Sequence, residues 1–166
     1  AADFAPYKVG TTTVTLASST IFAPGTYTVS ETTNPSYTQT FTGDCNASGQ
    51  ITLASGTAKL CTITNEEKLA YITLNKTVVN HGRSKVPNDF APFKVGSTTV
   101  TLGAQTPIDS GSYTITEATS PDYTLTFSGD CFTNGTITLN SGDNKICTLT
   151  NEENSGGGGG GSQSLA

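Results

Sequence analysis

The sequence predicts an all-β protein made of two tandem antiparallel β-sandwich domains, the first of which lacks its N-terminal strand. Three observations lead to this prediction. Only 34% of the 166 residues are hydrophobic and 13% are charged, and Thr, Ser, Asn and Gly fill the remainder. A segment of the chain occurs twice, and within each copy apolar residues alternate with Thr or Ser. Thr is β-branched and suits a half-exposed strand, so this composition favours sheets over a large helical core.

The internal repeat defines the domains. DFAPYKVG begins at Asp3 and DFAPFKVG begins at Asp89, an offset of 89 − 3 = 86 residues. Without any gap, 39 of the 65 positions are identical between residues 3–67 and 89–153. Such self-similarity at a fixed offset indicates duplication of one structural unit. We therefore expect one domain at 1–67, a second at 68–153, and a Gly-rich linker or tail at 154–166.

Strands are expected wherever the two-residue period appears. In the second copy these segments are 71–79, 98–102, 112–116, 123–127, 136–139 and 146–150, together with 89–95. Alternation over four to eight residues is typical of strands with one buried and one exposed face. Turn sequences such as Asn134-Gly135 and Ser141-Gly142-Asp143 separate them. About seven short strands is the number found in a β-sandwich.

The first copy has no counterpart of the strand at 69–79, because only Ala1 and Ala2 precede Asp3. Two explanations stay open. The chain is a fragment of a longer array, with 154–166 an engineered linker, or the first copy is a natural acceptor of a strand from another chain. A sandwich without one strand has an unpaired edge, which favours strand addition.

The cysteines form two pairs with the same spacing, Cys45 with Cys61 and Cys131 with Cys147. A zinc site is disfavoured because ligands usually come closely spaced and His81 is the only histidine. We therefore predict one disulfide within each domain. Disulfides indicate an oxidising, extracytoplasmic compartment, so the protein is expected to be extracellular or on the cell surface.

Several functional classes are disfavoured because the sequence lacks the features that they require. A formal net charge of −5 without clustered Lys and Arg disfavours nucleic acid as a partner. No apolar run approaches the roughly 20 residues of a membrane span. The sequence contains no phosphate-binding loop, nucleophile elbow, metal-ligand pattern or paired catalytic carboxylates, so neither a cofactor nor a metal is expected.

A family resemblance emerges from one motif. Ala23-Pro24-Gly25-Thr26-Tyr27-Thr28-Val29-Ser30-Glu31, followed by Pro35 and Tyr37, resembles the PG-x-Y-x-x-x-E…P-x-Y signature of prealbumin-like, collagen-adhesin B-type (SpaA-like) domains. Residues 109–123 repeat the pattern less closely. The resemblance implies an immunoglobulin-like, prealbumin-like sandwich in both copies. It also implies the setting of such domains, the stalks of Gram-positive adhesins and the shafts of pili.

The resemblance further implies a covalent cross-link. In that family a lysine on the first strand condenses with an asparagine on the last strand, assisted by an acid on a middle strand. The matching residues are Lys76, Asn151 and Glu117. In the first copy Glu31 and Asn65 match, and the partner lysine would come from another chain or a missing segment. The disulfides are a departure from the usual pattern of the family.

The expected function follows from these features. The chain is expected to be a structural repeat of an extracellular filament, pilus or surface stalk. Its expected partners are copies of itself or neighbouring repeats, joined by strand addition to the first repeat. The alternative is an adhesin module that binds a host or environmental ligand. Enzymatic turnover is not expected, because the cross-link would form once per domain.

Overall fold

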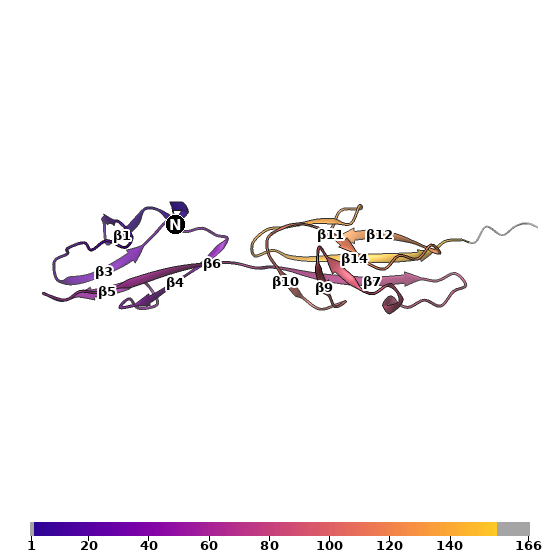
Figure 1. Cartoon of the computed structure of the whole chain (residues 1–166), viewed down its shortest axis with the longest axis horizontal. Coiled ribbons are helices and arrows are strands. Elements are labelled where there is room, and N and C mark those ends of the chain that lie inside the picture. The colour runs from indigo at the N-terminus through magenta and orange to yellow at the C-terminus, as the bar shows by residue number, and fades with distance from the viewer. Residues whose placement is uncertain (1, 156–166) are drawn as a thin grey trace, which may run out of the picture. The chain divides into compact units, whose positions relative to one another are not determined.

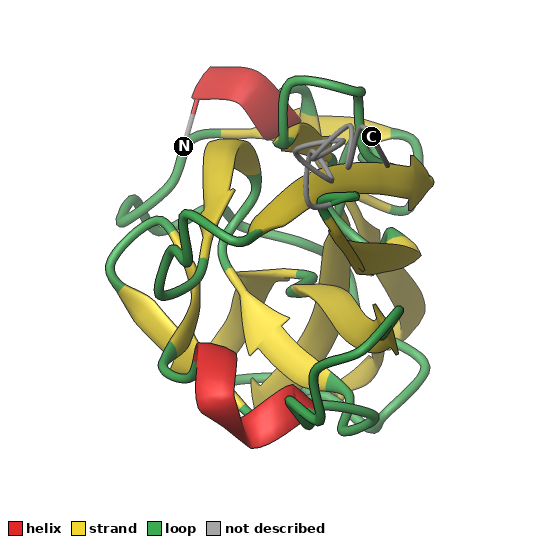
Figure 2. Cartoon of the chain, turned by 90° about the vertical axis from the view of Figure 1, so that its right-hand side faces the viewer, coloured by secondary structure: helices red, strands yellow, loops and turns green. Residues whose placement is uncertain are grey.

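The computed structural model describes residues 2–155, and it is all-β, as predicted. Figure 2 shows strands throughout, with two short helices. The chain divides into two compact units, Ala1–Lys68 (unit 1) and Leu69–Ala166 (unit 2). Neither of the helices in residues 2–155 is long or apolar enough to cross a membrane.

Unit 2 is built from two four-stranded sheets. One has the order β10-β7-β14-β12 and the other has the order β13-β11-β8-β9. The strands of the first sheet are β7 (Ala70–Val79), β10 (Thr106–Ile108), β12 (Tyr123–Gly129) and β14 (Asn144–Glu153). Those of the second sheet are β8 (Phe93–Val95), β9 (Thr98–Val100), β11 (Gly111–Thr116) and β13 (Thr136–Leu139).

The core of unit 2 follows from the alternation in its strands. On β7, Ile72 and Leu74 are fully buried, and Leu149 on β14 is buried with them. Ile137 on β13, in the other sheet, belongs to the same cluster. Because successive strand residues point to opposite faces, every second residue lies in this core and the Thr residues between them face outward.

The pairing of β7 with β14 is parallel, and it joins the first and last strands of unit 2. The register runs from Asn144 opposite Tyr71 to Glu152 opposite Val79. The two strands lie side by side in Figure 1. The predicted antiparallel pairing does not hold at this pair, while every other strand pair in the described chain is antiparallel. Parallel strands need a long connection, and here six further strands provide it.

Two elements of unit 2 differ from the sequence-based expectation. β10 was not predicted because it contains Pro107, which cannot donate a ladder hydrogen bond. The strand tolerates this proline because it lies at the edge of its sheet. The strand expected from Asp89 is instead a 3₁₀ helix, η2 (Pro87–Phe90), followed by β8. The Asp89 carboxylate accepts a hydrogen bond from the Val86 N–H at 2.8 Å and stabilises this turn.

Unit 1 contains counterparts of six of these eight strands, and its last strand, β6, pairs with a single neighbour. The first sheet contains β1 (Tyr7–Val9), β2 (Thr12–Val14), β3 (Gly25–Ser30) and β5 (Gln50–Leu53), in the order β2-β1-β3-β5, and follows the 3₁₀ helix η1 (Ala2–Phe4). The second sheet contains only β4 (Tyr37–Gly43) and β6 (Cys61–Glu67). Within residues 2–155, β6 pairs on one side, whereas its counterpart β14 pairs on both sides.

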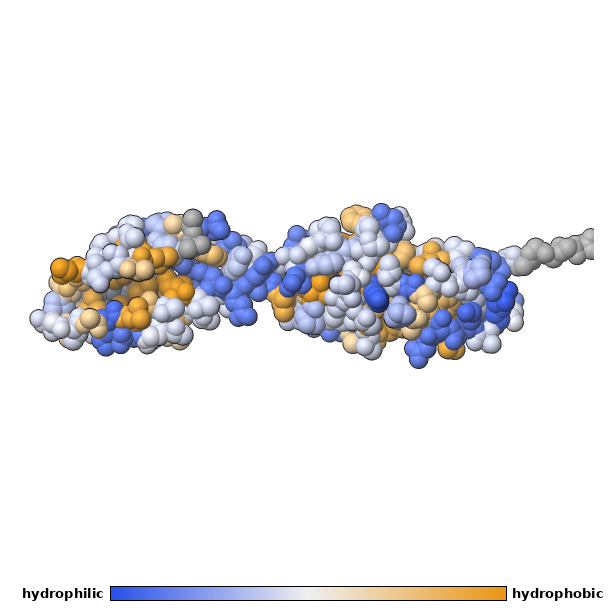
Figure 3. Space-filling model, in the orientation of Figure 1, coloured by the Kyte–Doolittle hydropathy of each residue, from blue (hydrophilic) through white to orange (hydrophobic). Residues whose placement is uncertain are grey.

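The core of unit 1 is correspondingly more open. Phe4 and Ile63 are half-buried, although their counterparts Phe90 and Leu149 are fully buried in unit 2. Figure 3 shows hydrophobic residues exposed on the surface of unit 1. The apolar residues of unit 1 are therefore less completely buried than their counterparts in unit 2.

Candidate functional site

Lys76, Glu117 and Asn151 meet inside unit 2. Lys76 Nζ donates a hydrogen bond to Glu117 Oε2 at 2.6 Å and makes a second, very short contact to Asn151 Oδ1. The side chains of Lys76 and Glu117 are each 1% exposed, and Asn151 is 2% exposed. A buried amine in contact with a carboxyl group and a carboxamide forms the candidate site.

The strand register places these three groups. Lys76 on β7 lies opposite Leu149, and Asn151 lies two residues further along β14, on the same face. Glu117 directly follows β11 in the facing sheet. The site therefore lies between the two sheets, where alternation directs side chains into the core.

Burial is the main influence on the Lys76 amine. It lowers the pKa of Lys76, and the hydrogen bond and charge of Glu117 oppose this shift without cancelling it. The amine lies 4.7 Å from the centre of the Phe90 ring and 6.0 Å from that of Phe93. Glu117 Oε1 is buried and has no hydrogen-bond partner. Proton transfer from Lys76 to Glu117 would leave two neutral groups, which an apolar site accommodates better than an ion pair.

The corresponding groups of unit 1 lie in a more open site. Glu31 and Asn65 are both half-buried. In place of a lysine amine, the carboxamide of Gln39 donates a hydrogen bond to Glu31 Oε1 at 2.8 Å. Gln39 lies opposite Asn65 in the β4–β6 pair. The sequence analysis did not identify Gln39. A comparison of the two copies could have found it, because a polar residue stands here in unit 1 where unit 2 has the apolar Leu125.

Both predicted disulfides are present. Cys45 bonds Cys61 and Cys131 bonds Cys147, with Cα–Cα distances of 5.3 and 5.5 Å. In unit 2, Gly129 on β12 lies opposite Cys147 on β14. It has φ +89°, and a Cβ there would be 2.5 Å from the Ile146 carbonyl oxygen. Only glycine fits this approach.

Removing either disulfide is expected to destabilise its own unit. The pair replacements Cys45→Ala/Cys61→Ala and Cys131→Ala/Cys147→Ala each release a loop with a sequence separation of 16, worth about 3 kcal/mol in the chain-entropy model. The loss should be larger in unit 2 because Cys147 is fully buried, so alanine also leaves a cavity there. Urea unfolding followed by hydrogen exchange of each unit measures both losses. Equal stability with and without reductant in the wild type would contradict this expectation.

A second polar cluster, which the sequence did not indicate, fixes the loop after β7. Glu153 accepts hydrogen bonds from the backbone N–H groups of His81 and Arg83, the latter at 3.0 Å. The Arg83 guanidinium also contacts Asp122 at 2.9 Å. The hydrogen bond from the Arg83 N–H is the main cause of a lowered Glu153 pKa.

This cluster predicts a pH-dependent contribution to stability. Because the pKa of Glu153 is lower in the folded protein, its contribution is complete above the unfolded value, about 4.3, and is lost as the pH falls through the folded value. Glu153→Gln is expected to lower the urea midpoint at pH 7, and the difference from wild type should shrink by pH 3. Glu152→Gln is the matched control, since the Glu152 carboxylate is 63% exposed and contacts only the His81 ring at 3.4 Å. A difference independent of pH would contradict the role of the charge.

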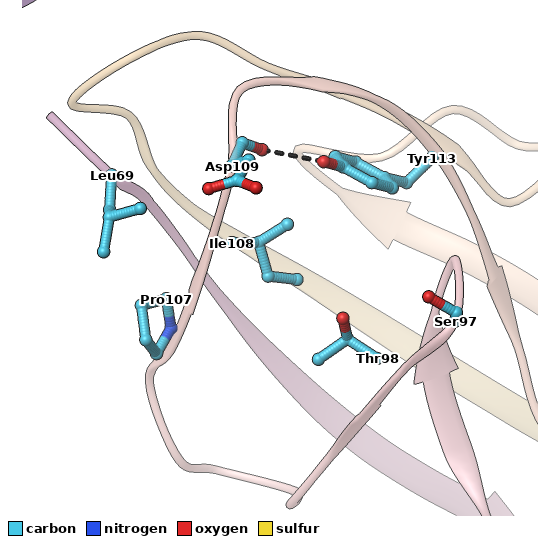
Figure 4. Close-up of a pocket in the computed structure, with 7 residues that line it drawn as sticks. All are labelled: Leu69, Ser97, Thr98, Pro107, Ile108, Asp109 and Tyr113. Atoms are coloured by element: carbon cyan, nitrogen blue, oxygen red, sulfur yellow. Dashed lines mark hydrogen bonds between the residues drawn. The ribbon is translucent and has the colours of Figure 1, made fainter. Parts of the chain in front are cut away.

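One surface hollow of unit 2 lies beside β10 and β11. Figure 4 shows this hollow, lined by Pro107, Ile108, Asp109 and Tyr113 among others, in which the Tyr113 hydroxyl donates to the Asp109 carbonyl oxygen at 2.9 Å. Its lining contains Ser97 but no histidine, lysine or cysteine that could activate a nucleophile. Among residues 2–155, no three His, Cys, Asp or Glu side chains are grouped so that they could hold a metal ion.

Fold and site together define unit 2 as a small β-sandwich whose first and last strands are held by a buried lysine, acid and asparagine. Comparison with known families agrees: the model of the SpaA-type prealbumin-like fold domain matches residues 67–149. The chain belongs to this family, and the predicted resemblance is confirmed. No curated protein matches the chain. Domains of this family are typical of extracellular and cell-surface proteins and suggest a role as a pilus or surface repeat.

Proposed function

We propose that the chain is a structural repeat subunit of an extracellular filament, pilus or surface stalk, composed of two tandem sandwich domains. The observation that carries this proposal is the buried contact of Lys76 with Glu117 and Asn151. We further propose that Lys76 and Asn151 become joined by an isopeptide bond. The bond would form once in each domain, so the protein is not an enzyme with turnover.

The chemistry needs only these three side chains. The Lys76 amine, whose pKa is lowered by burial, attacks the carboxamide carbon of Asn151 in its uncharged form. Glu117 takes the proton from the amine and passes it to the departing nitrogen. The new C–N bond replaces the C–NH₂ bond of Asn151, and one ammonia leaves. Glu117 Oε2 lies 2.6 Å from Lys76 Nζ, within the distance that direct proton transfer requires.

The strand order supports a mechanical role. Because β7 and β14 are parallel, a force that pulls the start of β7 away from the end of β14 loads all their hydrogen bonds in shear. A covalent bond between these strands would carry that force directly. The rest of unit 2 would then stay folded under tension.

Intact mass spectrometry of the folded chain tests the bond. We expect a loss of one ammonia, about 17 Da, beyond the hydrogens lost to the two disulfides, and a proteolytic fragment that joins Lys76 to Asn151. Glu117→Gln should retain the ammonia, because the acid is missing. A wild-type mass without this loss refutes the cross-link.

The assembly itself needs a separate measurement. Electron microscopy of the native material is expected to show fibres with a repeat of one or two domains. Partners would be further copies or neighbouring repeats, with a strand of another chain added to unit 1. A dispersed monomer that binds a ligand would favour the adhesin alternative instead.

A further inference from the structure

The turn between β12 and β13 contains the only Asn-Gly dipeptide of the sequence, Asn134-Gly135. Asn134 is exposed and Gly135 is buried. The fold needs glycine at 135, because φ is +79° and a Cβ there would lie 2.7 Å from Cζ of Phe127. It does not need asparagine at 134, since the equivalent residues of unit 1 are Ser48-Gly49. The two copies therefore differ in a residue that the turn itself does not require.

The Asn134 carboxamide folds back along its own backbone. Its Oδ1 accepts hydrogen bonds from the N–H and the hydroxyl group of Thr136, at 3.0 and 2.7 Å. Because Oδ1 reaches the residue two positions on, the carboxamide carbon lies beside the peptide bond that joins Asn134 to Gly135. An attack by the Gly135 nitrogen on this carbon closes a five-membered ring.

The surroundings of the carboxamide favour this attack. Negative charge develops on Oδ1 when a nucleophile adds to the carboxamide carbon, and both donors of Thr136 already point at this oxygen. Glycine also has no side chain to obstruct its nitrogen. The Gly135 N–H donates to the Phe132 carbonyl oxygen at 2.9 Å. This hydrogen bond must open before the attack, and it belongs to a turn whose residues 132–134 are exposed.

We propose that Asn134 is a site of spontaneous modification, at which the Gly135 nitrogen displaces ammonia from the Asn134 carboxamide and forms a succinimide. The new C–N bond replaces the C–NH₂ bond, and the proton of the Gly135 nitrogen leaves with the ammonia. Water then adds to one of the two ring carbonyls and breaks its bond to nitrogen, which gives aspartate or isoaspartate. This inference does not depend on the proposed function.

The two products differ in their effect on unit 2. Aspartate at 134 keeps an oxygen that can accept from both donors of Thr136, whereas isoaspartate adds one methylene to the backbone just before β13. In the described chain β13 lies at the edge of its sheet, and its Ile137 and Leu139 are each 1% exposed. Isoaspartate is therefore expected to lower the urea midpoint of unit 2, so that this domain loses stability as the chain ages.

Loss of ammonia at Asn134 changes the mass of the chain as much as a bond between Lys76 and Asn151 would. Hydroxylamine separates the two, because it cleaves a succinimide and leaves an amide between side chains intact. The cut falls between residues 134 and 135, and the Cys131–Cys147 disulfide spans it. After reduction the two fragments separate, unless Lys76 in the first is joined to Asn151 in the second. Separation would refute that bond without affecting the inference for Asn134.

The test incubates the folded whole chain at mildly alkaline pH and follows each asparagine by peptide mapping, with hydroxylamine cleavage at intervals. We expect Asn134 to convert to aspartate and isoaspartate, with cleavage before Gly135. Asn46 is the matched control, because its Oδ1 accepts from the N–H and hydroxyl groups of Ser48 at 3.1 and 2.8 Å, but Ala47 follows it. Asn134→Ser, which restores the dipeptide of unit 1, should abolish both the conversion and the cleavage.

Thr136→Val tests the hydroxyl donor, because it keeps the β-branched shape and removes the hydrogen bond. The conversion of Asn134 should slow several-fold in the folded variant and stay unchanged in urea, since only the fold holds the donor in place. A folded wild type that keeps Asn134 intact while the unfolded chain reacts overturns the inference. Equal rates at Asn46 and Asn134 overturn the role of Gly135, and equal rates in the folded wild type and Thr136→Val overturn the role of the hydroxyl group.

Discussion

Replacing Lys76 with alanine is expected to lower the free energy of unfolding of unit 2 more than any other single substitution. The change removes one member of a buried pair whose side chains are both 1% exposed, which costs about 3–5 kcal/mol because Glu117 is left without its partner. In the cross-linked protein Lys76 is an amide and not half of an ion pair, and the substitution then costs about 4 kcal/mol because a loop with a separation of 75 residues is no longer closed. Thermal unfolding with hydrogen exchange resolved by unit measures the effect.

A double substitution separates the two contributions. Lys76→Met/Glu117→Leu removes the buried charges together and keeps apolar volume, which is often neutral or stabilising for a buried pair. The stability that this variant fails to recover is then attributable to the covalent bond. Lys94→Ala is the matched control in the same unit, with an expected change within about 0.5 kcal/mol. If Lys76→Ala unfolds at the wild-type temperature, the site contributes neither an ion pair nor a cross-link.

Replacing Phe90 with alanine is expected to cost about 3–5 kcal/mol, through lost apolar burial and the cavity left behind. Phe90 is fully buried, and its ring meets the Tyr123 ring edge-on with centroids 5.3 Å apart. Its ring also lies 4.7 Å from Lys76 Nζ. The substitution would therefore admit water to the amine, raise its pKa toward the ordinary value and slow the cross-link. Urea unfolding measures the stability, and the time course of ammonia loss measures the reaction.

Unit 1 supplies the control for Phe90. Phe4 occupies the same position and meets Tyr37 edge-on at 5.1 Å, but it is half-buried. Phe4→Ala should therefore cost clearly less than Phe90→Ala. Equal losses would mean that the two positions are equally packed and would contradict the difference in their burial.

The sequence predicted the local features of this protein well because they depend on short-range patterns. Alternating Thr and apolar residues indicated β11, β12 and β13 closely, since the two-residue period is a property of a single strand. The equal spacing of the cysteines indicated both disulfides. Two elements whose residues do not show the pattern of their structure were not predicted. They are β10, which contains Pro107, and the 3₁₀ helix that ends at Phe90.

The candidate site was predicted only in part. The family motif supplied Lys76, Glu117 and Asn151, but their mutual contact depends on a strand register between residues 75 positions apart. Composition and periodicity carry no information on that register. The hydrogen bonds that Glu153 accepts from the His81 and Arg83 N–H groups were not predicted either. Charged residues at strand ends are ordinarily solvent-exposed, so the sequence offered no reason to expect these contacts.

The sequence by itself determined that the chain is all-β, that one unit is duplicated, and where most strands and both disulfides lie. Strand propensity and alternation are properties of residues close together in the chain, and the repeat is found by comparing two segments of the sequence directly. Tertiary structure alone decided that the first and last strands of unit 2 pair in parallel and bring an amine, an acid and a carboxamide into one buried contact. It also decided that the Gln39 carboxamide donates a hydrogen bond to Glu31. Such contacts arise from packing of two sheets against each other, which no local pattern specifies.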